Sequence, residues 1–540
     1  MSQILQHPAL GPIKGISLLD KLWQFRSIPY ASISQRFARS KVRSDLPKSD
    51  NSIYDATHVG PSSIQPRGSA RQDAQSNQLP TDGIDEQEQS EDCLRVTITR
   101  PLSLERHSVH AKLPVVVFLH GGAFFLGSGE RPWLSPLTFC CDALKQARPL
   151  LFVSMNYRLG ALGFFHSPEA SELIPPNNGL HDQIRGFEWI RKHIAGFGGD
   201  PDNITAIGQS AGGESLSLHN LSGHEAPLYR RSITLSGSLV TMPPKSPSQH
   251  QENFLKQAKG MGIPTEDRSS VEIAQDMCTI DIQKIRETTF VGAPCTSDDV
   301  MPYDWPTMQL ARSAPSSQVS WLESQIVSSC TYDGSISYIM TSKNEQRKGH
   351  AKSFLRIAEE LIHNPQSLLD IYNISADDDD PTALLKICQF ESDIGFFTAA
   401  LSQATGSTRT KTYLQLFELG NPFEGLLPQN KFATHTWDIV ALLGAFEARL
   451  PDHLNTVVRE WRKKTIEYIT SGTKPCAEWR VAGAALLVDN NEVKSVAKKE
   501  FMGKESRLDR LWALAEAEKG EEGCDFLWEG LCRRWLDRGS

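Results

Sequence analysis

The 540-residue sequence lacks several features that would place it in a specialised class of protein. Its apolar runs, such as residues 115–119, fall far short of the ~20 residues that a membrane-spanning helix needs. No basic cluster is longer than residues 462–464 and the formal net charge is −8, which argues against a surface that follows nucleic-acid phosphates. The ten cysteines form no C-x-x-C pair, which argues against zinc ribbons and thioredoxin chemistry. We therefore expect no membrane span, no nucleic-acid partner and no metal or other cofactor.

The N-terminus also lacks a secretory signal pattern, because it has neither a basic region nor an apolar stretch of about seven residues. Together with the cysteine usage, this predicts an intracellular, cytoplasmic chain whose thiols are reduced. Hydrophobic residues make up 39% of the sequence and, with glycine included, the fraction is close to that of ordinary globular domains. A chain of this length can bury a large core without metal or disulfide cross-links.

Short β-branched segments alternate with helical ones along most of the chain. The region 181–195 carries apolar residues at positions 184, 187, 190 and 194, which is the spacing of one helix face. Strand, helix and strand in this order predict an α/β fold, in which a central, mostly parallel, twisted sheet has helices on both faces. The expected strands are residues 115–119, 150–154, 204–207, 233–235, 325–328 and 412–417.

The first motif with chemical meaning is Gly208-Gln209-Ser210-Ala211-Gly212, a G-x-S-x-G match. It follows an expected strand and opens a helical run, as required of a nucleophile elbow, the strained turn that exposes a serine Oγ. The backbone N–H groups at that helix N-terminus favour developing negative charge. The alternative, a turn built from small residues for packing alone, is disfavoured by this context. We therefore predict that Ser210 is a nucleophile.

A second glycine-rich segment, His120-Gly121-Gly122-Ala123-Phe124, also stands at a strand end. Glycines there let the loop pass close to a substrate and direct N–H groups inward. The amides of Gly122 and Ala123, with that of Ala211, are predicted to hold the oxyanion of an acyl-transfer intermediate. Without the serine motif, an ordinary glycine-rich turn would be the better interpretation.

These motifs belong to a set of sequence blocks that resembles the type-B carboxylesterase/lipase family, the cholinesterase-like branch of the α/β-hydrolases. The likeness covers roughly residues 10–480. It implies an α/β-hydrolase fold with helical insertions over the active site, and cleavage of carboxylic esters. The other blocks are Glu91-Asp92-Cys93-Leu94, Asn156-Tyr157-Arg158-Leu159-Gly160, Asn178-Gly179-Leu180-His181-Asp182-Gln183, Phe197-Gly198-Gly199-Asp200-Pro201 and Ser236-Gly237-Ser238.

The resemblance implies a catalytic triad in the chain order serine, acid, histidine. The acid should follow the fifth expected strand directly before a glycine, which selects Asp333, although the family more often has glutamate there. Because aspartate is one methylene shorter, the imidazole must sit closer or the loop must lean in. The histidine should be His435, which matches the family's H-x-x-[DE]-[LI] loop. The rival acids Glu323 and Asp299 and the other downstream histidines, His350, His363 and His453, lack these contexts.

Several positions depart from the family pattern. Cys93 would form the family's first disulfide with a cysteine after Gly60-Pro61, but Ser62-Ser63 stands there, so Cys93 is predicted to be unpaired. The polar stretch 61–92 contains no tryptophan to stack a quaternary ammonium, and Gln209 replaces the usual glutamate before the nucleophile. Choline esters are therefore not the expected substrate.

The large apolar residues Phe124, Phe125 and Trp437 flank the predicted site, beside Gln209. They are candidates for a pocket that receives acyl or aromatic groups, with plain core packing as an alternative at even odds.

We expect one domain over residues 1–540, in five parts. The stretch 61–92 is predicted to be a long surface loop. Residues 241–320 and 340–405 are helix-rich insertions, which usually lie over the strand ends and form the substrate cavity. The parts are 1–112 with small strands and the long loop, 113–240 with the nucleophile, 241–410 with helical insertions around the acid strand, 411–485 with the histidine, and 486–540 as a helical tail.

Three function classes follow from these residues. The first is a serine hydrolase that cleaves a bulky or apolar small-molecule ester or lactone through Ser210, His435 and Asp333. The second is non-hydrolytic acyl transfer, elimination or cyclisation on a specialised metabolite. The third, a non-catalytic binding protein, is remote because the triad is complete. The oligomeric state stays open.

Overall fold

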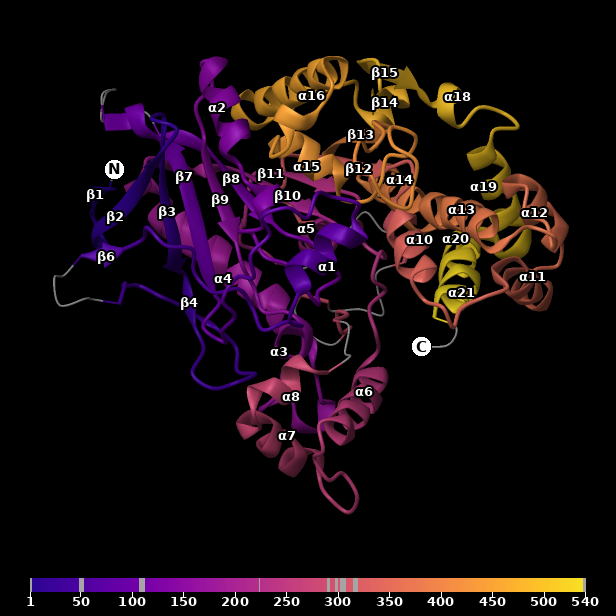
Figure 1. Cartoon of the computed structure of the whole chain (residues 1–540), viewed down its shortest axis with the longest axis horizontal. Coiled ribbons are helices and arrows are strands. Elements are labelled where there is room, and N and C mark those ends of the chain that lie inside the picture. The colour runs from indigo at the N-terminus through magenta and orange to yellow at the C-terminus, as the bar shows by residue number, and fades with distance from the viewer. Residues whose placement is uncertain are drawn as a thin grey trace.

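The computed structural model describes residues 2–47, 53–105, 112–222, 224–288, 292–296, 300–301, 307–313 and 319–537. A large twisted sheet runs through the centre of the molecule (Figure 1). In sheet order its strands are β1 (Ser2–His7), β2 (Gly11–Leu18), β3 (Leu22–Pro29), β7 (Arg95–Pro101), β9 (Leu151–Met155), β8 (Leu113–Leu119), β10 (Gly199–Gln209), β11 (Arg231–Leu235), β12 (Ser324–Cys330), β13 (Lys411–Phe417), β14 (Ala484–Val488) and β15 (Val493–Ala497). The short β6 (Tyr54–Asp55) pairs with β2, and β4 (Ala31–Ser32) pairs with β5 (Lys41–Val42).

The middle of the sheet, from β9 to β14, is parallel, and antiparallel strands flank it on both sides. The six strands expected from the sequence are β8 to β13, and the prediction of their type is confirmed. Along β8, Val115, Val117 and Leu119 face one core while Val116 and Phe118 face another. Burial on both faces explains why this strand reads as an unbroken apolar run.

Helices cover both faces of the sheet. Residues of α2, α15 and α16 pack in the core that contains Val116 and Phe118, and residues of α4 and α5 pack in the core on the opposite face. The helices are α1 (Ser69–Ser76), α2 (Leu137–Lys145), α3 (Gly160–Phe164), α4 (Asn178–His193), α5 (Ala211–Leu221), α6 (Pro247–Gly260), α7 (Ser270–Thr279), α8 (Ile282–Arg286), α9 (Met308–Ser313), α10 (Ser335–Ser342), α11 (His350–Leu361), α12 (Pro365–Tyr372), α13 (Asp380–Glu391), α14 (Thr398–Gly406), α15 (Trp437–Leu443), α16 (Asp452–Ser471), α17 (Trp479–Ala482), α18 (Lys498–Phe501), α19 (Arg507–Lys519), α20 (Gly523–Asp525) and α21 (Arg534–Leu536). Two π-helical segments, η6 (Ser392–Phe397) and η9 (Phe526–Arg533), interrupt this series.

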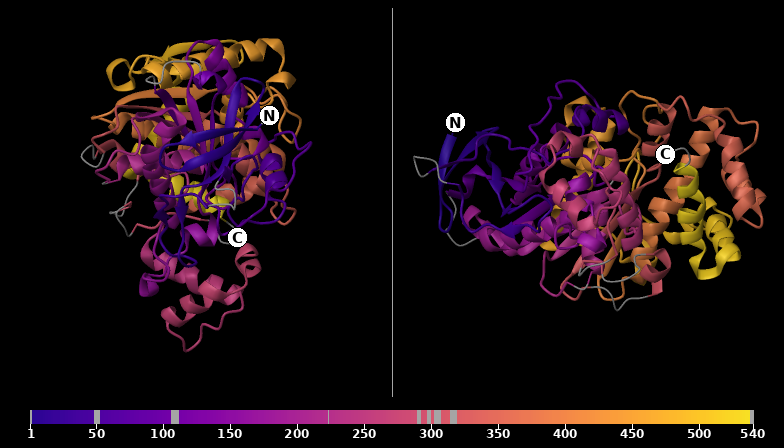
Figure 2. Two further views of the ribbon diagram at one scale, coloured as in Figure 1. Left: turned by 90° about the vertical axis from the view of Figure 1, so that its left-hand side faces the viewer. Right: turned by 90° about the horizontal axis from the view of Figure 1, so that it is seen from below.

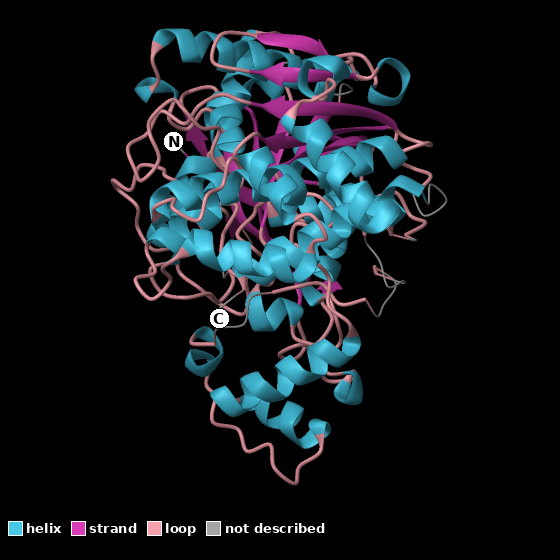
Figure 3. Cartoon of the chain, turned by 90° about the vertical axis from the view of Figure 1, so that its right-hand side faces the viewer, coloured by secondary structure: helices cyan, strands magenta, loops and turns pink. Residues whose placement is uncertain are grey.

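The insertions form two separate bodies. Helices α6, α7 and α8 make a lobe that projects from the main body at the bottom of Figures 1 and 3. Helices α11 to α13 pack against α19 to α21 around a common apolar core at the C-terminal end of the molecule, opposite the N-terminal strands (Figure 2).

The tail was expected to be helical throughout, and its first part is not. Residues 484–497 form β14 and β15, which extend the sheet beyond β13. The apolar run of β14 is mostly buried beside β13, whereas β15 is a partly exposed edge strand with polar residues. Further along, the indole Nε1 of Trp528 donates to the Val240 carbonyl, 2.8 Å away, and fixes the tail to the segment that follows β11.

The polar stretch 61–92 is not the surface loop predicted from its composition. It contains α1, and Ala70, Ala74 and Leu79 are buried. Its ends are joined by a β-bridge between Ser62 and Gln89. The composition misled because many of the residues that become buried here are polar and find hydrogen-bond partners far away in the sequence.

No helix within the described ranges has the length and apolarity to cross a membrane. Nor do the described His, Cys, Asp and Glu residues gather in a group of three or more that could hold a metal ion.

Candidate active site

Ser210 stands on the sharp turn between the end of β10 and the start of α5. Its backbone angles, φ 55° and ψ −127°, are strained for a residue with a side chain. Its amide donates to the Leu235 carbonyl at 2.9 Å, which ties the turn to β11. A Cβ on Gly208 would overlap the Gly212 carbonyl, and a Cβ on Gly237 would overlap that of Ser210. The glycines are therefore required because backbone passes backbone at contact distance.

The structure brings Ser210, His435 and Asp333 into one hydrogen-bonded row. His435 Nε2 lies 2.9 Å from Ser210 Oγ, and His435 Nδ1 lies 2.7 Å from Asp333 Oδ1. The second carboxylate oxygen of Asp333 accepts the Cys330 amide at 2.8 Å. Asp333 is fully buried and His435 is 5% exposed, so water competes little for these contacts. A serine, an imidazole and a carboxylate in this arrangement can act as nucleophile, base and orienting acid in acyl transfer.

The loops that carry Asp333 and His435 lie side by side, which resolves how the shorter acid reaches the ring. A parallel β-bridge joins Tyr332 to Thr434, the residues that immediately precede the two. In addition, the His435 amide donates to Ser335 Oγ at 2.8 Å. Aspartate spans the gap because the two backbones are held together next to it.

The glycine-rich loop after β8 lies directly against Ser210. A Cβ on Gly121 would come within 2.7 Å of Ser210 Cβ. Gly122, Ala123 and Phe124 all have positive φ, at 107°, 53° and 55°, so the chain coils tightly here. Among the described residues, the amides of Gly122 and Ala123 have no hydrogen-bond acceptor. Ala211 opens α5, so its amide also lies outside the helical hydrogen-bond ladder.

The electrostatic environment favours a protonated His435. Burial alone would lower the pKa of the ring, but the hydrogen bond and the charge of Asp333 outweigh it, with help from Asp438 and Glu391, so the pKa is raised. Burial raises the pKa of Asp438 to about 6 and that of Glu391 to about 7. An imidazole of raised basicity suits a general base that is charged in the transition state.

Three residues near His435 were not among the predicted site residues. Asp438 accepts the Ser236 hydroxyl at 2.7 Å, and Glu391 accepts the Ser337 hydroxyl at 2.6 Å. Phe396 packs edge-on against the His435 ring, with 5.4 Å between ring centroids. Asp438 had a signal, because it fills the acidic position of the H-x-x-[DE] loop. Glu391 and Phe396 had none, since only the packing of α13 and η6 brings them here.

The residues predicted to line a pocket lie in different settings. Phe124 is fully buried and packs on Phe164, and Trp437 is 1% exposed and packs edge-on against Phe423. Both rings belong to the apolar cores. Phe125 is partly buried and lies near Gly160. Gln209 is buried beside Gly121.

Two of the rival residues, Glu323 and His363, have partners outside the row. Glu323 precedes β12, at the opposite end of that strand from Asp333, and pairs with Arg230. His363 pairs with Glu518. Asp299 is outside the described residues.

The ten cysteines, Cys93 among them, form no disulfide bond in this structure. Ser63 stands at the position considered for the missing partner, and its side chain favours the charged form of the Cys93 thiol. Burial raises the pKa of this thiol to about 12, so it stays protonated.

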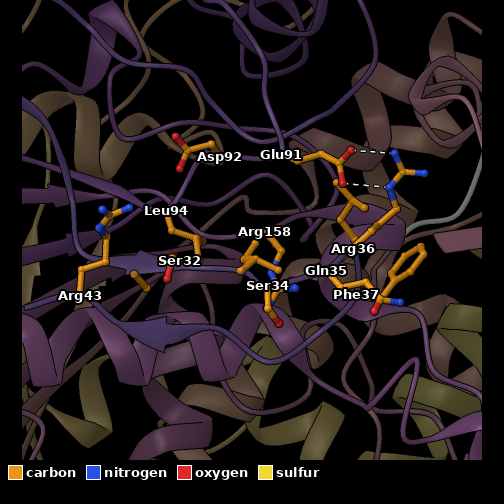
Figure 4. Close-up of a pocket in the computed structure, with 13 residues that line it drawn as sticks. Ser32, Ser34, Gln35, Arg36, Phe37, Arg43, Glu91, Asp92, Leu94 and Arg158 are labelled. Atoms are coloured by element: carbon orange, nitrogen blue, oxygen red, sulfur yellow. Dashed lines mark hydrogen bonds and ion pairs between the residues drawn. The ribbon is translucent and has the colours of Figure 1, made fainter. Parts of the chain in front are cut away.

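A surface cavity of about 470 Å³ lies beside β4 and β5, and the residues that line it include no member of the triad. Figure 4 shows Arg36 bound there to Glu91 through two hydrogen bonds of 2.9 and 2.7 Å. The remaining guanidinium nitrogen of Arg36 donates to the Ile280 carbonyl at 2.5 Å. Arg36 and Glu91 thus connect the end of α7, in the projecting lobe, to the N-terminal part of the chain.

The parallel sheet, with Ser210 on the turn after β10 and with Asp333 and His435 on the loops after β12 and β13, has the α/β-hydrolase fold. The fold agrees with solved structures: a PNB esterase superposes with a TM-score of 0.72 at 21% identity, covering 94% of this chain and 99% of that one. A thermophilic PNB esterase gives a TM-score of 0.73 at 20% identity and covers 94% and 100% of the two chains.

The sequence profile described as "Carboxylesterase family" matches residues 2–471, and the chain belongs to this family. Lipase 3 of Yarrowia lipolytica is 29% identical over 338 residues, 61% of this chain and 62% of the lipase. The para-nitrobenzyl esterase of Bacillus subtilis is 33% identical over 267 residues, 49% of this chain and 50% of that protein. The inactive carboxylesterase-like protein VdtD of Byssochlamys spectabilis is 37% identical over 165 residues, 31% and 28% of the two chains. Each match thus spans less than two thirds of the relative's own length.

Proposed function

We propose that this protein is a serine hydrolase that cleaves a small-molecule carboxylic ester through an acyl-enzyme on Ser210. The observation that carries the proposal is the hydrogen-bonded row of Ser210, His435 and Asp333, in which each distance is 2.9 Å or less. Such a row, placed on a strained strand-to-helix turn, is what nucleophilic acyl transfer needs. Membership of the carboxylesterase family supports the same chemistry.

In this mechanism His435 takes the proton of Ser210 as the serine oxygen attacks the ester carbonyl. The amides of Gly122, Ala123 and Ala211 stabilise the oxyanion, since they are donors without acceptors beside the nucleophile. Asp333 keeps the Nδ1 proton on the ring and stabilises the imidazolium. His435 then protonates the leaving alkoxide and activates a water molecule that releases the acid.

The substrate class we propose is a bulky or apolar ester or lactone without a fixed positive charge. Phe396 provides an apolar ring against His435. Gln209, beside Ser210, is neutral, and the stretch 61–92 holds no tryptophan for a quaternary ammonium. The setting we propose is reducing and cytoplasmic, and ten cysteines that form no disulfide are consistent with it.

The proposal is tested by hydrolysis of a chain-length series of p-nitrophenyl esters. We expect turnover of short and medium esters, and its loss in Ser210→Ala. Ser217→Ala is the matched control, because it removes a buried hydroxyl of the same helix that has no hydrogen-bond partner among the described residues. Turnover that survives in Ser210→Ala would refute the nucleophile. A wild-type protein that reacts with a serine-directed phosphonate but hydrolyses no ester would point instead to acyl transfer, elimination or cyclisation.

A further inference from the structure

The stretch after α1 is bound to the loop that carries the catalytic histidine. Thr436, the residue next to His435, donates its hydroxyl to Asn77 Oδ1 at 2.8 Å. Asn77 is 5% exposed and Thr436 is 7% exposed, so this hydrogen bond is shielded from water. The two residues are 359 positions apart in the chain. This buried contact links the N-terminal part of the chain to the residue that follows His435.

Further hydrogen bonds support this contact. They involve residues 73–78, the last turn of α1 and the two residues after it, which we name the strap. On the side of the strap, Asn77 Nδ2 donates to the carbonyl and to the carboxylate of Asp73, at 2.8 and 3.0 Å. On the histidine side, Asn421 Nδ2 donates to Thr434 Oγ1 at 2.7 Å and to the Gln78 carbonyl at 3.2 Å. The strap therefore contacts Thr436 directly and is linked to Thr434 through Asn421.

Gln78, the last residue of the strap, is bound to the loop between β13 and α15, which also carries His435. Its side-chain nitrogen donates to the carbonyls of Phe423 and Leu427, at 2.9 and 3.1 Å, and its oxygen accepts the Leu427 amide at 3.0 Å. The whole Gln78 amide group is thus used on one segment, residues 423–427. Anchored at Gln78, the strap presents Asn77 to Thr436 at a fixed place.

Thr436 has a backbone conformation that needs such support. Its φ of 70° and ψ of −20° are left-handed, a conformation that β-branched residues rarely adopt. A strained residue persists only where its surroundings hold it there, and such residues cluster at functional sites. The hydroxyl of Thr436 is held by Asn77, so the contact fixes the very peptide that follows the catalytic ring.

We propose that Asn77 is a positioning residue, which orients His435 toward Ser210 by holding Thr436 in its left-handed conformation. The inference rests on the proposed function, because it assigns a role toward the base of that mechanism. In this role Asn77 acts through Thr436 and not on the reacting atoms. Losing its hydrogen bond lets the backbone at Thr436 relax, and the ring then spends less time in line with Ser210 Oγ. Proton transfer slows in both acylation and deacylation, while binding of a small ester is little affected.

The test measures kcat and KM for p-nitrophenyl butyrate in Asn77→Ala, Thr436→Val and Thr436→Ser. Rates are expressed per active site, counted by end-point titration with a serine-directed phosphonate, so that unfolded protein does not enter. We expect kcat to fall by about three- to tenfold in Asn77→Ala and Thr436→Val, the effect of one lost hydrogen bond, with KM within about twofold. Thr436→Ser keeps the hydroxyl and should retain near wild-type kcat. The matched control is Asn455→Ala, which removes another buried asparagine whose amide bonds the Leu450 carbonyl; its kcat should not change.

The double variant Asn77→Ala/Thr436→Val adds a sharper criterion. Because both single changes remove the same hydrogen bond, the double variant should be no slower than the slower single one. Unchanged kcat in both single variants, or losses that multiply in the double variant, would overturn the inference. If Asn77→Ala does not fold, the pair Thr436→Val and Thr436→Ser decides alone: equal kcat values would overturn it. Failure of the proposed function is a separate result, since turnover retained in Ser210→Ala would remove the mechanism itself.

Discussion

Replacing Asp333 by asparagine should disable the base while leaving the fold of the site in place. Both carboxylate oxygens of Asp333 accept from N–H donors, His435 Nδ1 at 2.7 Å and the Cys330 amide at 2.8 Å. Asparagine offers only one acceptor oxygen. The Cys330 amide can only donate, so it should keep that oxygen, and the new NH₂ group then faces His435 Nδ1. The ring must accept there and carry its proton on Nε2, which faces Ser210.

A histidine with its proton on Nε2 cannot take the serine proton, so kcat should fall by about 10⁴, the loss seen when a triad aspartate becomes asparagine. This corresponds to about 5.4 kcal/mol of lost transition-state stabilisation. The assay is steady-state hydrolysis of p-nitrophenyl butyrate, with kcat referred to the protein concentration and folding checked by circular dichroism. KM should change much less than kcat.

Asp333→Glu is the informative companion, because it keeps the carboxylate and changes only its reach. The site is fully buried and the two loops are already joined by the Tyr332–Thr434 bridge, so the extra methylene must be absorbed by a shift of the ring or the loop. We expect Asp333→Glu to retain far more activity than Asp333→Asn. A folded Asp333→Asn protein that keeps more than about a tenth of the wild-type kcat would refute this account of the acid.

Three further predictions concern the surroundings of the site. Burial lowers the pKa of His435, but Asp333 outweighs burial and Asp438 adds to its effect, so the pKa is raised and kcat/KM should fall as the pH drops below it. Asp438→Asn should move this acid limb of the pH profile of kcat/KM to lower pH. An acid limb that does not move would contradict the effect assigned to Asp438. Ser63→Cys should form a disulfide with Cys93 under mild oxidation. Because the bond closes a loop of about 31 residues, it should stabilise the fold by ~3.7 kcal/mol in the chain-entropy treatment and raise Tm, and dithiothreitol should reverse the rise. A thiol titration that still finds every cysteine reduced would exclude this disulfide. Gln209→Glu adds a carboxylate beside Ser210, so the ratio of kcat/KM for a cationic ester to that for its neutral isostere should rise by roughly tenfold. The same ratio in the wild type and the variant would place Gln209 away from the substrate.

The local sequence predicted most of the sheet and the elbow. Apolar runs such as residues 115–119 are recognisable as strands because the central parallel strands are buried on both faces. The glycines around Ser210 are required because backbone atoms come into contact within that turn. Strand types and the placement of the G-x-S-x-G motif therefore depend on information that lies within a few residues. The positions of Asp333 and His435 came from the order of family motifs rather than from local pattern.

Features that depend on distant polar partners were not predictable in this way. Composition marked the stretch 61–92 as surface, yet Gln78 is buried by partners 345 and 349 positions away. Phe396 reaches His435 because η6 follows α13 as a π-helical segment, a feature that side-chain periodicity does not reveal. For Phe124 the sequence left pocket lining and core packing as alternatives, and only the structure shows that its ring is buried against Phe164.

The central claim is that Ser210 forms a covalent acyl-enzyme, and it is tested most directly by trapping that species. The protein is mixed with a p-nitrophenyl ester that acylates quickly and deacylates slowly, quenched in acid, digested and analysed by mass spectrometry. The account predicts one acyl group per chain, on the peptide that contains Ser210, formed with a stoichiometric burst of p-nitrophenol and absent from Ser210→Ala. Ester turnover without a burst, or an acyl group on another residue, would contradict it.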